Sequence, residues 1–334
     1  MPKIPHVLMN QLQVATVALA LHLLASAAQG SLLVGAHRGN SSAAPENTIA
    51  SIQAAVGFAD LSEMDVRVTK DGELVLMHDA GLNRTTNGRG AVKRKTLHEL
   101  QSLDAGSWFS SSFAGEAIPT LEQSINAAMT VGIEPLIERK AGTAAMYHDQ
   151  FMQMNLDESD FRVISFNRRF ISDLNDLNPD YQLGILGGGR LSQAKLDRLA
   201  DLGADFLSWR HSSVTQSVVD LVHANGMDLH VWTVNNPVRM QQLIDLGVDG
   251  ITTDYPEQLR DLLPPAELIA PSGLASFAIS PESAPTAPTL MLQQPAASAV
   301  AVPEPEFAMM LTFVFGFSIG RRLRTRRREP RPWR

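Results

Sequence analysis

The chain has 334 residues, 44% of them hydrophobic, and a formal net charge of −7; this length and composition fit one large globular domain or two smaller ones. It has no cysteine, which excludes disulfides, thiolate metal sites and cysteine nucleophiles. Residues 321–334 carry eight arginines and one glutamate, so residues 1–320 sum to −14; such an acidic body argues against nucleic acid as a partner.

The first predicted element is an export signal over residues 1–27. Lys3 precedes an apolar run from Val14 to Leu24, and the small residues Ala25-Ser26-Ala27 follow it. This order is typical of a secretory signal peptide. The run is shorter than the roughly 20 apolar residues of a membrane span, so we expect an exported protein.

Residues 31–263 alternate short β-rich apolar stretches with helical patterns, which is typical of repeated βα units and a parallel sheet. The predicted strands are Leu32–Ala36, Leu61–Val66, Glu73–Met77, Glu134–Ile137, Arg162–Ser165, Gln182–Leu186, Asp205–Ser208, Asp228–Trp232 and Gly250–Thr252. The predicted helices include Asn47–Phe58, Leu121–Val131, Gln193–Leu202, Gln216–Asn225 and Val238–Leu246, and Gly203, Gly226 and Gly247 mark the ends of three.

One of these nine strands cannot belong to a parallel barrel. Only Thr69-Lys70-Asp71-Gly72 separates Val68 from Glu73, whereas parallel neighbours need a crossover of roughly a dozen residues. The turn therefore predicts an antiparallel hairpin that opens an insertion over residues 71–120. The remaining eight strands favour a (β/α)8 TIM barrel over the alternative, a doubly wound open sheet.

Polar side chains gather at the carboxyl ends of these strands, where barrel enzymes place their active sites. They are His37 and Arg38 after the first strand, Glu63 and Asp65 in the second, His78 at the end of the hairpin, and Glu138 and Lys140 after the insertion. Glu63 and Asp65 are two residues apart, as are Glu138 and Lys140, and this spacing points both side chains of each pair to one face of the strand. We expect all of these groups at one rim of the barrel.

The residue types at this rim predict phosphoester cleavage. The carboxylates Glu63, Asp65 and Glu138 would repel one another without a cation, and oxygen ligands suit one divalent ion, Mg²⁺ or Ca²⁺. The cations Arg38 and Lys140 suit a phosphate group.

Two histidines complete this set of groups. His37 and His78 could form a general acid–base pair near neutral pH. Trp232, at the end of a later strand, is expected to line the substrate pocket. The other histidines of residues 31–263 have no partner motif, and we interpret them as structural: His98, His148, His211, His223 and His230.

These residues lie in motifs that together resemble the glycerophosphodiester phosphodiesterase family over residues 32–262. The motifs are Ala36-His37-Arg38-Gly39, Pro45-Glu46-Asn47-Thr48, Glu63-Met64-Asp65-Val66, Met77-His78-Asp79, Arg84-Thr85-Thr86, Ile118-Pro119-Thr120-Leu121, Glu138-Arg139-Lys140, Ser165-Phe166, Trp232-Thr233-Val234-Asn235 and Thr253-Asp254-Tyr255-Pro256. The segment Gly187-Gly188-Gly189-Arg190 fits none of the family's motifs and is interpreted as a mobile loop.

The resemblance implies a (β/α)8 fold and hydrolysis of glycerophosphodiesters to sn-glycerol 3-phosphate and an alcohol. It implies that Glu63, Asp65 and Glu138 bind the metal, that His37 and His78 are acid and base, that Arg38 and Lys140 contact phosphate, and that Glu46 orders the first histidine loop or its arginine. A lysophospholipase D or sphingomyelinase D-like enzyme on the same barrel is one alternative. A non-catalytic surface protein that binds phosphorylated ligands is the other.

The C-terminal part resembles a second kind of signal. Residues 264–301 are rich in Pro, Ala and Ser, which predicts a linker. Val302-Pro303-Glu304-Pro305, an apolar stretch from Phe307 to Ile319 and the arginines from Arg321 onward resemble the PEP-CTERM sorting signal of Gram-negative bacteria. This implies transient contact with the inner membrane and a periplasmic, cell-surface or extracellular protein; a plain C-terminal anchor is the alternative.

Overall fold

The computed structural model describes residues 31–264. The predicted signal peptide and the predicted sorting signal therefore lie outside the described residues, as does the predicted linker beyond residue 264. Within the described part of the chain, no helix is both long enough and apolar enough to cross a lipid bilayer.

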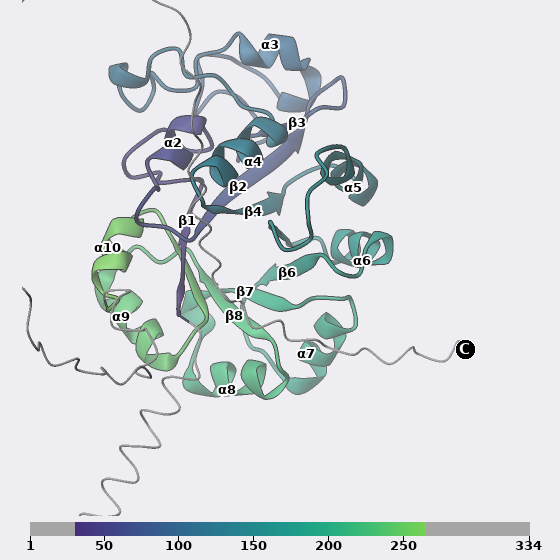
Figure 1. Ribbon diagram of the computed structural model, residues 1–334, viewed down its shortest axis with the longest axis vertical. Helices are drawn as coiled ribbons and strands as arrows, with labels where there is room; N and C mark the ends of the chain where they lie inside the picture. Colours follow the sequence, from purple (N-terminus) through teal and green to yellow (C-terminus); the bar gives the residue numbers. More distant parts are fainter. Residues whose placement is uncertain (1–30, 265–334) are drawn as a thin grey trace, which may run out of the picture. The chain divides into compact units, whose positions relative to one another are not determined.

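Eight parallel strands form a closed barrel (Figure 1). They are β1 (Leu33–Ala36), β2 (Leu61–Val68), β4 (Glu134–Arg139), β5 (Arg162–Ser165), β6 (Gln182–Gly187), β7 (Phe206–Arg210), β8 (Asp228–Trp232) and β9 (Gly250–Thr253). The sheet closes because β1 pairs with β9 on one side and with β2 on the other. The predicted (β/α)8 barrel is confirmed, and this closure rules out the open sheet.

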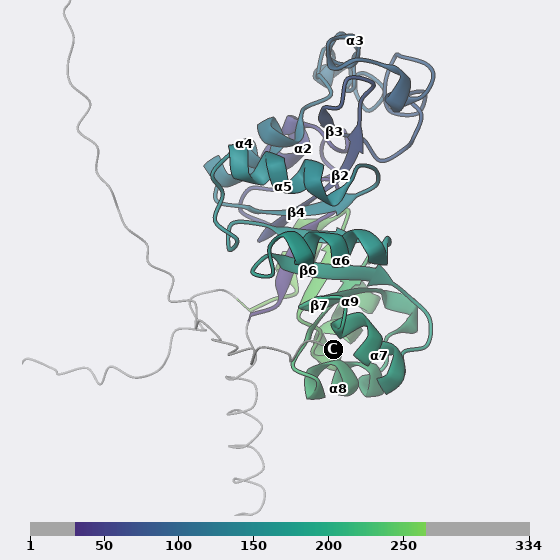
Figure 2. The ribbon, with the colours of Figure 1, turned by 90° about the vertical axis from the view of Figure 1, so that its right-hand side faces the viewer.

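The remaining strand, β3 (Leu74–Leu76), pairs antiparallel with β2, as the four-residue turn predicted. It opens an insertion that also contains the short helices η1 (Val92–Arg94), α3 (Leu97–Gln101) and η2 (Ser111–Phe113). The insertion has its own apolar core, made of Val75, Met77, Leu82, Val92, Leu100, Ala105 and Ile118. In both ribbon views it lies at the upper end of the described unit, beyond β2 and β3 (Figures 1 and 2).

Helices surround the barrel. They are α2 (Ile49–Gln53), α4 (Leu121–Thr130), α5 (Ala144–Gln153), α6 (Arg168–Leu177), α7 (Gln193–Ala200), α8 (Gln216–Ala224), α9 (Pro237–Leu246) and α10 (Pro256–Asp261). Polar residues begin several of them: the side chains of Thr48, Thr120 and Asn236 accept hydrogen bonds from the first turns of α2, α4 and α9. Gly247 ends α9 with a left-handed φ of 78°, in agreement with the predicted stop.

The first helix is shorter than the sequence suggests. The prediction began it at Asn47 and ended it at Phe58, whereas α2 covers only Ile49–Gln53. Asn47 has a φ of 58°, which is outside the right-handed helical region. Its side chain is hydrogen bonded to Asp65 in β2, so a tertiary contact removes this residue from the helix.

Alternation along the strands produces two apolar layers. Leu61, Leu136, Ile164, Leu186 and Phe206 form a cluster inside the barrel. A larger cluster lies between the strands and the surrounding helices and includes Met64, Ile137, Val163 and Leu183. The period of two residues thus separates a filled barrel interior from the helix-facing core.

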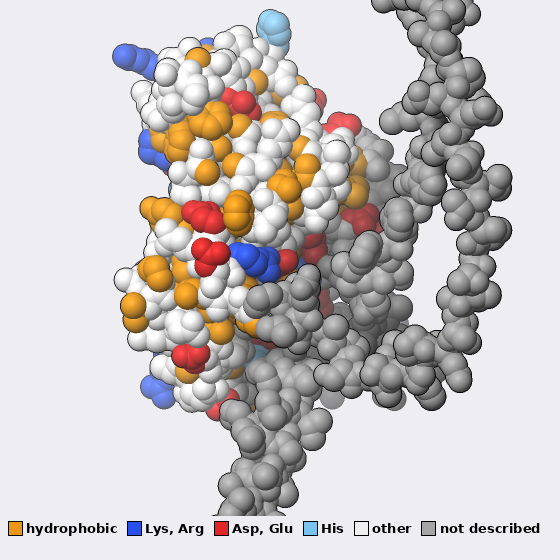
Figure 3. Space-filling model, turned by 60° about the vertical axis from the view of Figure 1, so that its left-hand side comes forward, with side chains coloured by type: hydrophobic (Ala, Val, Ile, Leu, Met, Phe, Trp, Pro, Cys, Tyr) orange, Lys and Arg blue, Asp and Glu red, His pale blue; other side chains and the backbone are white. Residues whose placement is uncertain are grey.

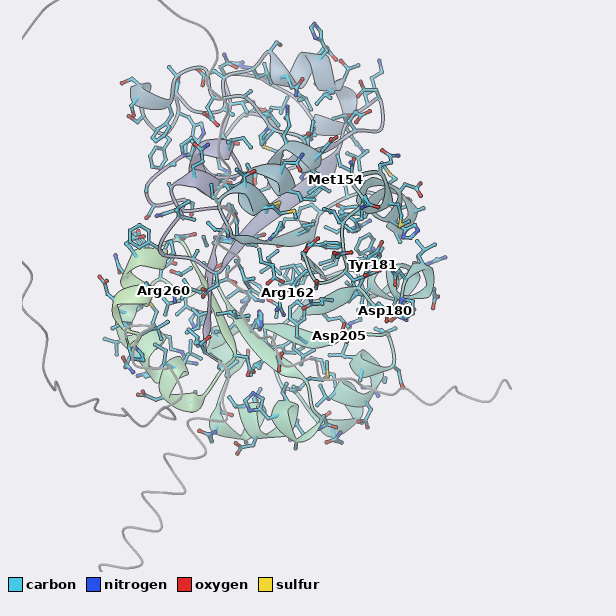
Figure 4. All side chains as sticks on the ribbon, viewed as in Figure 1. Met154, Arg162, Asp180, Tyr181, Asp205 and Arg260 are labelled. Carbon is cyan, nitrogen blue, oxygen red and sulfur yellow. The ribbon has the colours of Figure 1, made fainter. Side chains whose placement is uncertain are left out.

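Charged side chains connect the amino-terminal ends of the strands. Asp205 accepts a hydrogen bond of 3.0 Å from the Leu183 backbone in the neighbouring strand. Arg162, at the start of β5, forms a 2.9 Å ion pair with Glu134, at the start of β4. Figure 4 labels Arg162 and Asp205, which belong to this end of the barrel. These contacts stabilise the end opposite to the predicted site.

On the side of the molecule drawn in Figure 3, acidic and basic side chains are interspersed, and hydrophobic ones gather in the upper part.

Candidate active site

Three buried carboxylates converge at the carboxyl ends of β2 and β4. Asp65 pairs in register with Glu138, and Glu63 lies two residues before Asp65 on the same face. One carboxylate oxygen from each of the three residues lies within 4.8 Å of the others. The residues are only 2%, 0% and 7% exposed for Glu63, Asp65 and Glu138, respectively. The two-residue spacing therefore brings the predicted cluster together as expected.

Two cations compensate part of this negative charge. Lys140 Nζ lies 2.6 Å from Glu138 Oε1 and 3.0 Å from Asp65 Oδ1, and Arg38 Nε lies 3.2 Å from Asp65 Oδ2. Burial acts to raise the pKa of Asp65, but Lys140 and Arg38 outweigh it, so this pKa stays below its usual value. Burial raises the pKa of Glu63 well above its usual range, and repulsion from Asp65 and Glu138 adds to that effect. The cluster is thus not fully neutralised by protein groups.

These residues fit a divalent cation. Glu63 Oε1 is buried and has no hydrogen-bond partner, although its other oxygen accepts a 2.8 Å bond from the Arg38 amide. A buried, unpartnered carboxylate oxygen is costly unless a cation compensates it. The donors are all carboxylate oxygens, the ligands preferred by Mg²⁺ and Ca²⁺ rather than by zinc or softer metals. Glu63, Asp65 and Glu138 could therefore hold such an ion.

Two strained residues order this cluster. Arg38 and Asn47 have φ values of 59° and 58°, in the left-handed region that residues other than glycine rarely adopt. The Arg38 conformation directs its amide to Glu63. Asn47 donates to Asp65 Oδ2 at 2.8 Å and accepts from the Asp65 amide at 2.9 Å. The strain is thus coupled to two bonds that fix the orientation of the carboxylates.

Each predicted catalytic histidine has a carboxylate on its Nδ1 atom. His37 Nδ1 lies 2.6 Å from Asp254 Oδ1, just after β9, and His78 Nδ1 lies 2.8 Å from Asp79 Oδ1. Burial acts to raise the pKa of Asp254, but the hydrogen bond and the charge of His37 lower it to about 2. A carboxylate that accepts from Nδ1 leaves Nε2 available for proton transfer. This arrangement suits one histidine to act as base and the other as acid.

A chain of ion pairs joins the two histidine loops. Arg84 donates to both oxygens of Glu46, at 2.7 and 2.8 Å, and to Asp79 Oδ2 at 2.7 Å. Glu46 also accepts a 2.9 Å bond from Arg38. Asp79 in turn holds His78, so the network runs from Arg38 to His78 through Arg84. Glu46 therefore orders the arginine of the first histidine loop, and it does so together with Arg84.

Trp232 lies on the other half of the barrel mouth. It packs on the apolar cluster inside the barrel, and its indole N–H donates to the Ser208 carbonyl at 2.9 Å. Its ring meets the ring of Phe166, at the end of β5, with centroids 5.5 Å apart and an interplanar angle of 90°. Arg210, at the end of β7, places its guanidinium carbon 5.6 Å from the Trp232 centroid. Phe166 and Trp232 thus form an aromatic pair beside the charged cluster.

The structure brings the predicted residues to one rim, but sequence reasoning missed several of their partners. It gave no role to Asp254, Asp79, Arg84 or Asn47, although each lies in a quoted motif. Asp254 had an available signal, since it follows the last strand directly, as His37 follows the first. The ion pairs of Arg84 had none, because they depend on how two irregular loops meet.

Comparison with known proteins agrees with this geometry. Residues 37–258 match the model of the glycerophosphoryl diester phosphodiesterase family. A glycerophosphodiester phosphodiesterase of Caldanaerobacter subterraneus is 39% identical over 246 residues, which cover 69% of this chain and 97% of that protein. One of Bacillus subtilis is 31% identical over 254 residues, covering 68% and 84%.

A solved structure is also similar. It is an Oleispira antarctica phosphodiesterase in complex with the product sn-glycerol 3-phosphate, with 31% identity and a TM-score of 0.65 over 69% of this chain and 96% of that one. The family match over residues 37–258 includes the three carboxylates and both histidine loops. The chain is therefore a phosphodiesterase that belongs to the glycerophosphoryl diester phosphodiesterase family.

Proposed function

We propose that this protein hydrolyses glycerophosphodiesters to sn-glycerol 3-phosphate and an alcohol, with one divalent cation, Mg²⁺ or Ca²⁺, bound by Glu63, Asp65 and Glu138. The observation that carries the proposal is the buried carboxylate cluster flanked by two histidines, each with a carboxylate on Nδ1. The product bound to the similar Oleispira antarctica enzyme supports the same chemistry.

In this mechanism, some protein groups stabilise charge on the phosphate and others transfer protons. A bound cation would offset the charge on the non-bridging phosphate oxygens. Arg38 and Lys140 bind those oxygens from the protein side, where their charges stabilise the transition state. One histidine removes a proton from the nucleophile, and the other gives a proton to the departing alcohol. The nucleophile is water, or the glycerol hydroxyl of the substrate itself by way of a cyclic phosphate.

The direct test is cation-dependent release of sn-glycerol 3-phosphate. The purified protein is treated with EDTA and assayed on glycerophosphocholine and glycerophosphoglycerol before and after addition of Mg²⁺ or Ca²⁺. We expect activity only with a cation. We also expect His37→Ala and His78→Ala each to lose about 10²–10⁴-fold in kcat, with the cation-dependent rise in melting temperature retained.

Three results would contradict the proposal. Wild-type rates in either histidine variant would remove that histidine from the mechanism. Lack of activity with every cation, combined with cleavage of a lysophospholipid, would identify a lysophospholipase D instead. If neither substrate class is cleaved but phosphorylated ligands still bind, the protein is a binding module. His98→Ala, an exposed histidine of the insertion, is the matched control and should keep full activity.

We further propose that the protein is exported and that its C-terminal segment directs it to the inner membrane for processing. Both segments lie outside the described residues. The support for this proposal is therefore the sequence alone, in which residues 1–27 and 302–334 have the order of residues that is typical of such signals. Mass spectrometry of the protein from its native host should show a chain without either segment. A mature chain that retains residues 302–334 would favour a plain anchor.

A further inference from the structure

The two halves of the barrel mouth carry different sets of charged residues. The half formed by the ends of β1, β2, β4 and β9 carries the acidic residues Glu63, Asp65, Glu138 and Asp254. The four segments that follow β5, β6, β7 and β8 contain no Asp or Glu, over residues 166–172, 188–195, 210–219 and 232–242. They contain six basic residues, namely Arg168, Arg169, Arg190, Lys195, Arg210 and Arg239. We call these six the basic half-rim.

Most of this positive charge has no carboxylate partner. Of the six residues, only Arg169 forms an ion pair in the described part of the chain, with Asp173 at 3.6 Å. Lys195 and Arg239 donate only to uncharged groups, largely backbone carbonyls. Burial lowers the pKa of Lys195, and repulsion from Arg168 and Arg198 lowers it further. Positive charges at the surface without counter-charges favour the binding of an anion.

The triple glycine, for which the family motifs gave no role, holds part of this half-rim together. A Cβ atom on Gly187 would lie 2.3 Å from the Trp209 ring, and one on Gly188 would lie 3.0 Å from Arg210 Cβ. Only glycine therefore lets this loop pack so closely against β7. The Gly189 amide donates to the Ser213 hydroxyl at 2.9 Å, and the loop carbonyls accept from Trp209 and Lys195. The predicted mobile loop is thus anchored: Gly188 packs against Arg210, and Lys195 lies over the Trp209 ring, 4.4 Å from its centroid.

The aromatic pair connects this half-rim to the metal cluster. Ile164 in β5 pairs in register with Glu138, and Phe166 follows Ile164 by two residues on the same face. Trp232 pairs in register with Arg210, and its ring contacts both Phe166 and Arg210. Phe166 is 54% exposed, so its ring is accessible at the rim. A substrate whose phosphate lies at Arg38 and Lys140 can therefore extend its alcohol across this pair to Arg210.

We infer that the basic half-rim binds a second anionic group of the substrate, so that the preferred glycerophosphodiesters are those whose alcohol carries a further phosphodiester or other negative charge. This inference rests on the proposed function. A quaternary ammonium group such as choline is disfavoured, because Arg210 already lies over the Trp232 ring that would attract such a group. The arginines also suit a phosphodiester through paired N–H donors.

Three substrates that share the glycerophospho group and differ in the charge of the alcohol test this inference. They are glycerophosphocholine, glycerophosphoglycerol and bis(glycerophospho)glycerol, whose alcohols are positive, neutral and negative. We expect kcat/KM to increase in that order, by about tenfold or more between the ends of the series. The preference should weaken as ionic strength rises, because salt screens exposed charges.

The variants Arg190→Gln and Arg210→Gln locate the effect. In the double variant, the ratio of kcat/KM for bis(glycerophospho)glycerol to that for glycerophosphocholine should fall about tenfold, mainly through KM. The control Arg89→Gln removes an exposed arginine of the insertion and should leave the ratio and the rates unchanged. Thermal melting of each variant verifies that it is folded.

The outcomes separate the inference from the function on which it rests. Equal kcat/KM for the three substrates, or a ratio that the double variant does not change, would overturn the inference and leave the phosphodiesterase proposal intact. Failure to cleave any of the three substrates with Mg²⁺ or Ca²⁺ would instead overturn the proposed function.

Discussion

At the scale of single residues, the candidate site depends on side chains that hold other side chains. Asp254 and Asp79 accept from Nδ1 of His37 and His78 and thereby set which ring nitrogen carries the proton. Asn47 and Arg38 adopt left-handed backbone conformations and direct hydrogen bonds to Asp65 and Glu63. We interpret all four residues as necessary for the geometry of the carboxylate cluster and of the two histidines.

Asp79→Asn tests this view of His78. Burial lowers the pKa of His78, and the Asp79 hydrogen bond acts against that shift. The variant should therefore lower the pKa of His78 further and move the limb of the pH–rate profile that His78 governs to lower pH. We expect kcat to fall by about 10–100-fold, less than for loss of the histidine itself. Glu73→Gln, an exposed change on the same hairpin, should leave the profile unchanged. An Asp79→Asn profile identical to that of the wild type would contradict the positioning role.

At the scale of elements, the insertion is a small separate core attached to the barrel through functional residues. Its apolar cluster is distinct from the clusters of the barrel, and β3 continues the sheet only as an antiparallel neighbour of β2. His78 lies two residues after the end of β3, so the position of the insertion decides where this histidine lies. The ion pairs of Arg84 with Glu46 and Asp79 connect the insertion to the loop between β1 and α2.

Arg84→Lys should loosen that connection. Lysine keeps the positive charge but cannot donate in pairs to Glu46 while also binding Asp79. We expect a loss of roughly tenfold in kcat, equivalent to ~1.4 kcal/mol. Amide hydrogen exchange over residues 78–86 should become faster. Arg94→Lys, at an exposed position in the same insertion, is the control. Unchanged exchange and unchanged kcat in Arg84→Lys would show that the two loops are ordered by other contacts.

At the scale of the whole molecule, a histidine in the interior of the barrel makes the stability of the fold sensitive to acid. His230 in β8 is 2% exposed, its ring lies 4.8 Å from that of Phe206, and its Nε2 has no hydrogen-bond partner. Burial lowers the pKa of His230 from 6.5 to about 3, and Arg162 adds to the shift. The folded barrel therefore holds this histidine neutral under conditions in which the unfolded chain would bind a proton.

The sign of the resulting pH dependence follows from linkage. Above pH 6.5 the histidine is neutral in both states and has no effect. Between 6.5 and about 3 only the unfolded chain binds the proton, so the free energy of unfolding decreases as the pH falls. The slope from this group approaches about 1.4 kcal/mol per pH unit. In urea denaturation, His230→Leu should reduce the loss of stability below pH 6, whereas His98→Leu at an exposed position should not. An unchanged acid dependence in His230→Leu would disprove the assignment.

The local pattern of the sequence was sufficient for the barrel fold and for the carboxylate cluster. Strand positions follow from alternation and composition, and the four-residue turn after Val68 allowed only a hairpin. Because strand side chains alternate with a period of two, the spacing of Glu63 and Asp65 alone predicted that both lie on the same face of their strand. Parallel strands place their carboxyl ends at one rim, which also brought His37 and Glu138 into the predicted site.

Only the tertiary structure decided how this rim is completed. His37 and Asp254 are 217 positions apart, and Arg84 meets Glu46 across 38 positions. The pairing of Phe166 with Trp232 and the packing of the triple glycine against β7 likewise depend on loops with no repeating pattern. Backbone periodicity determines the direction of a side chain within its own strand. Contacts between irregular loops are determined by closure of the whole barrel, which no local pattern of residues encodes.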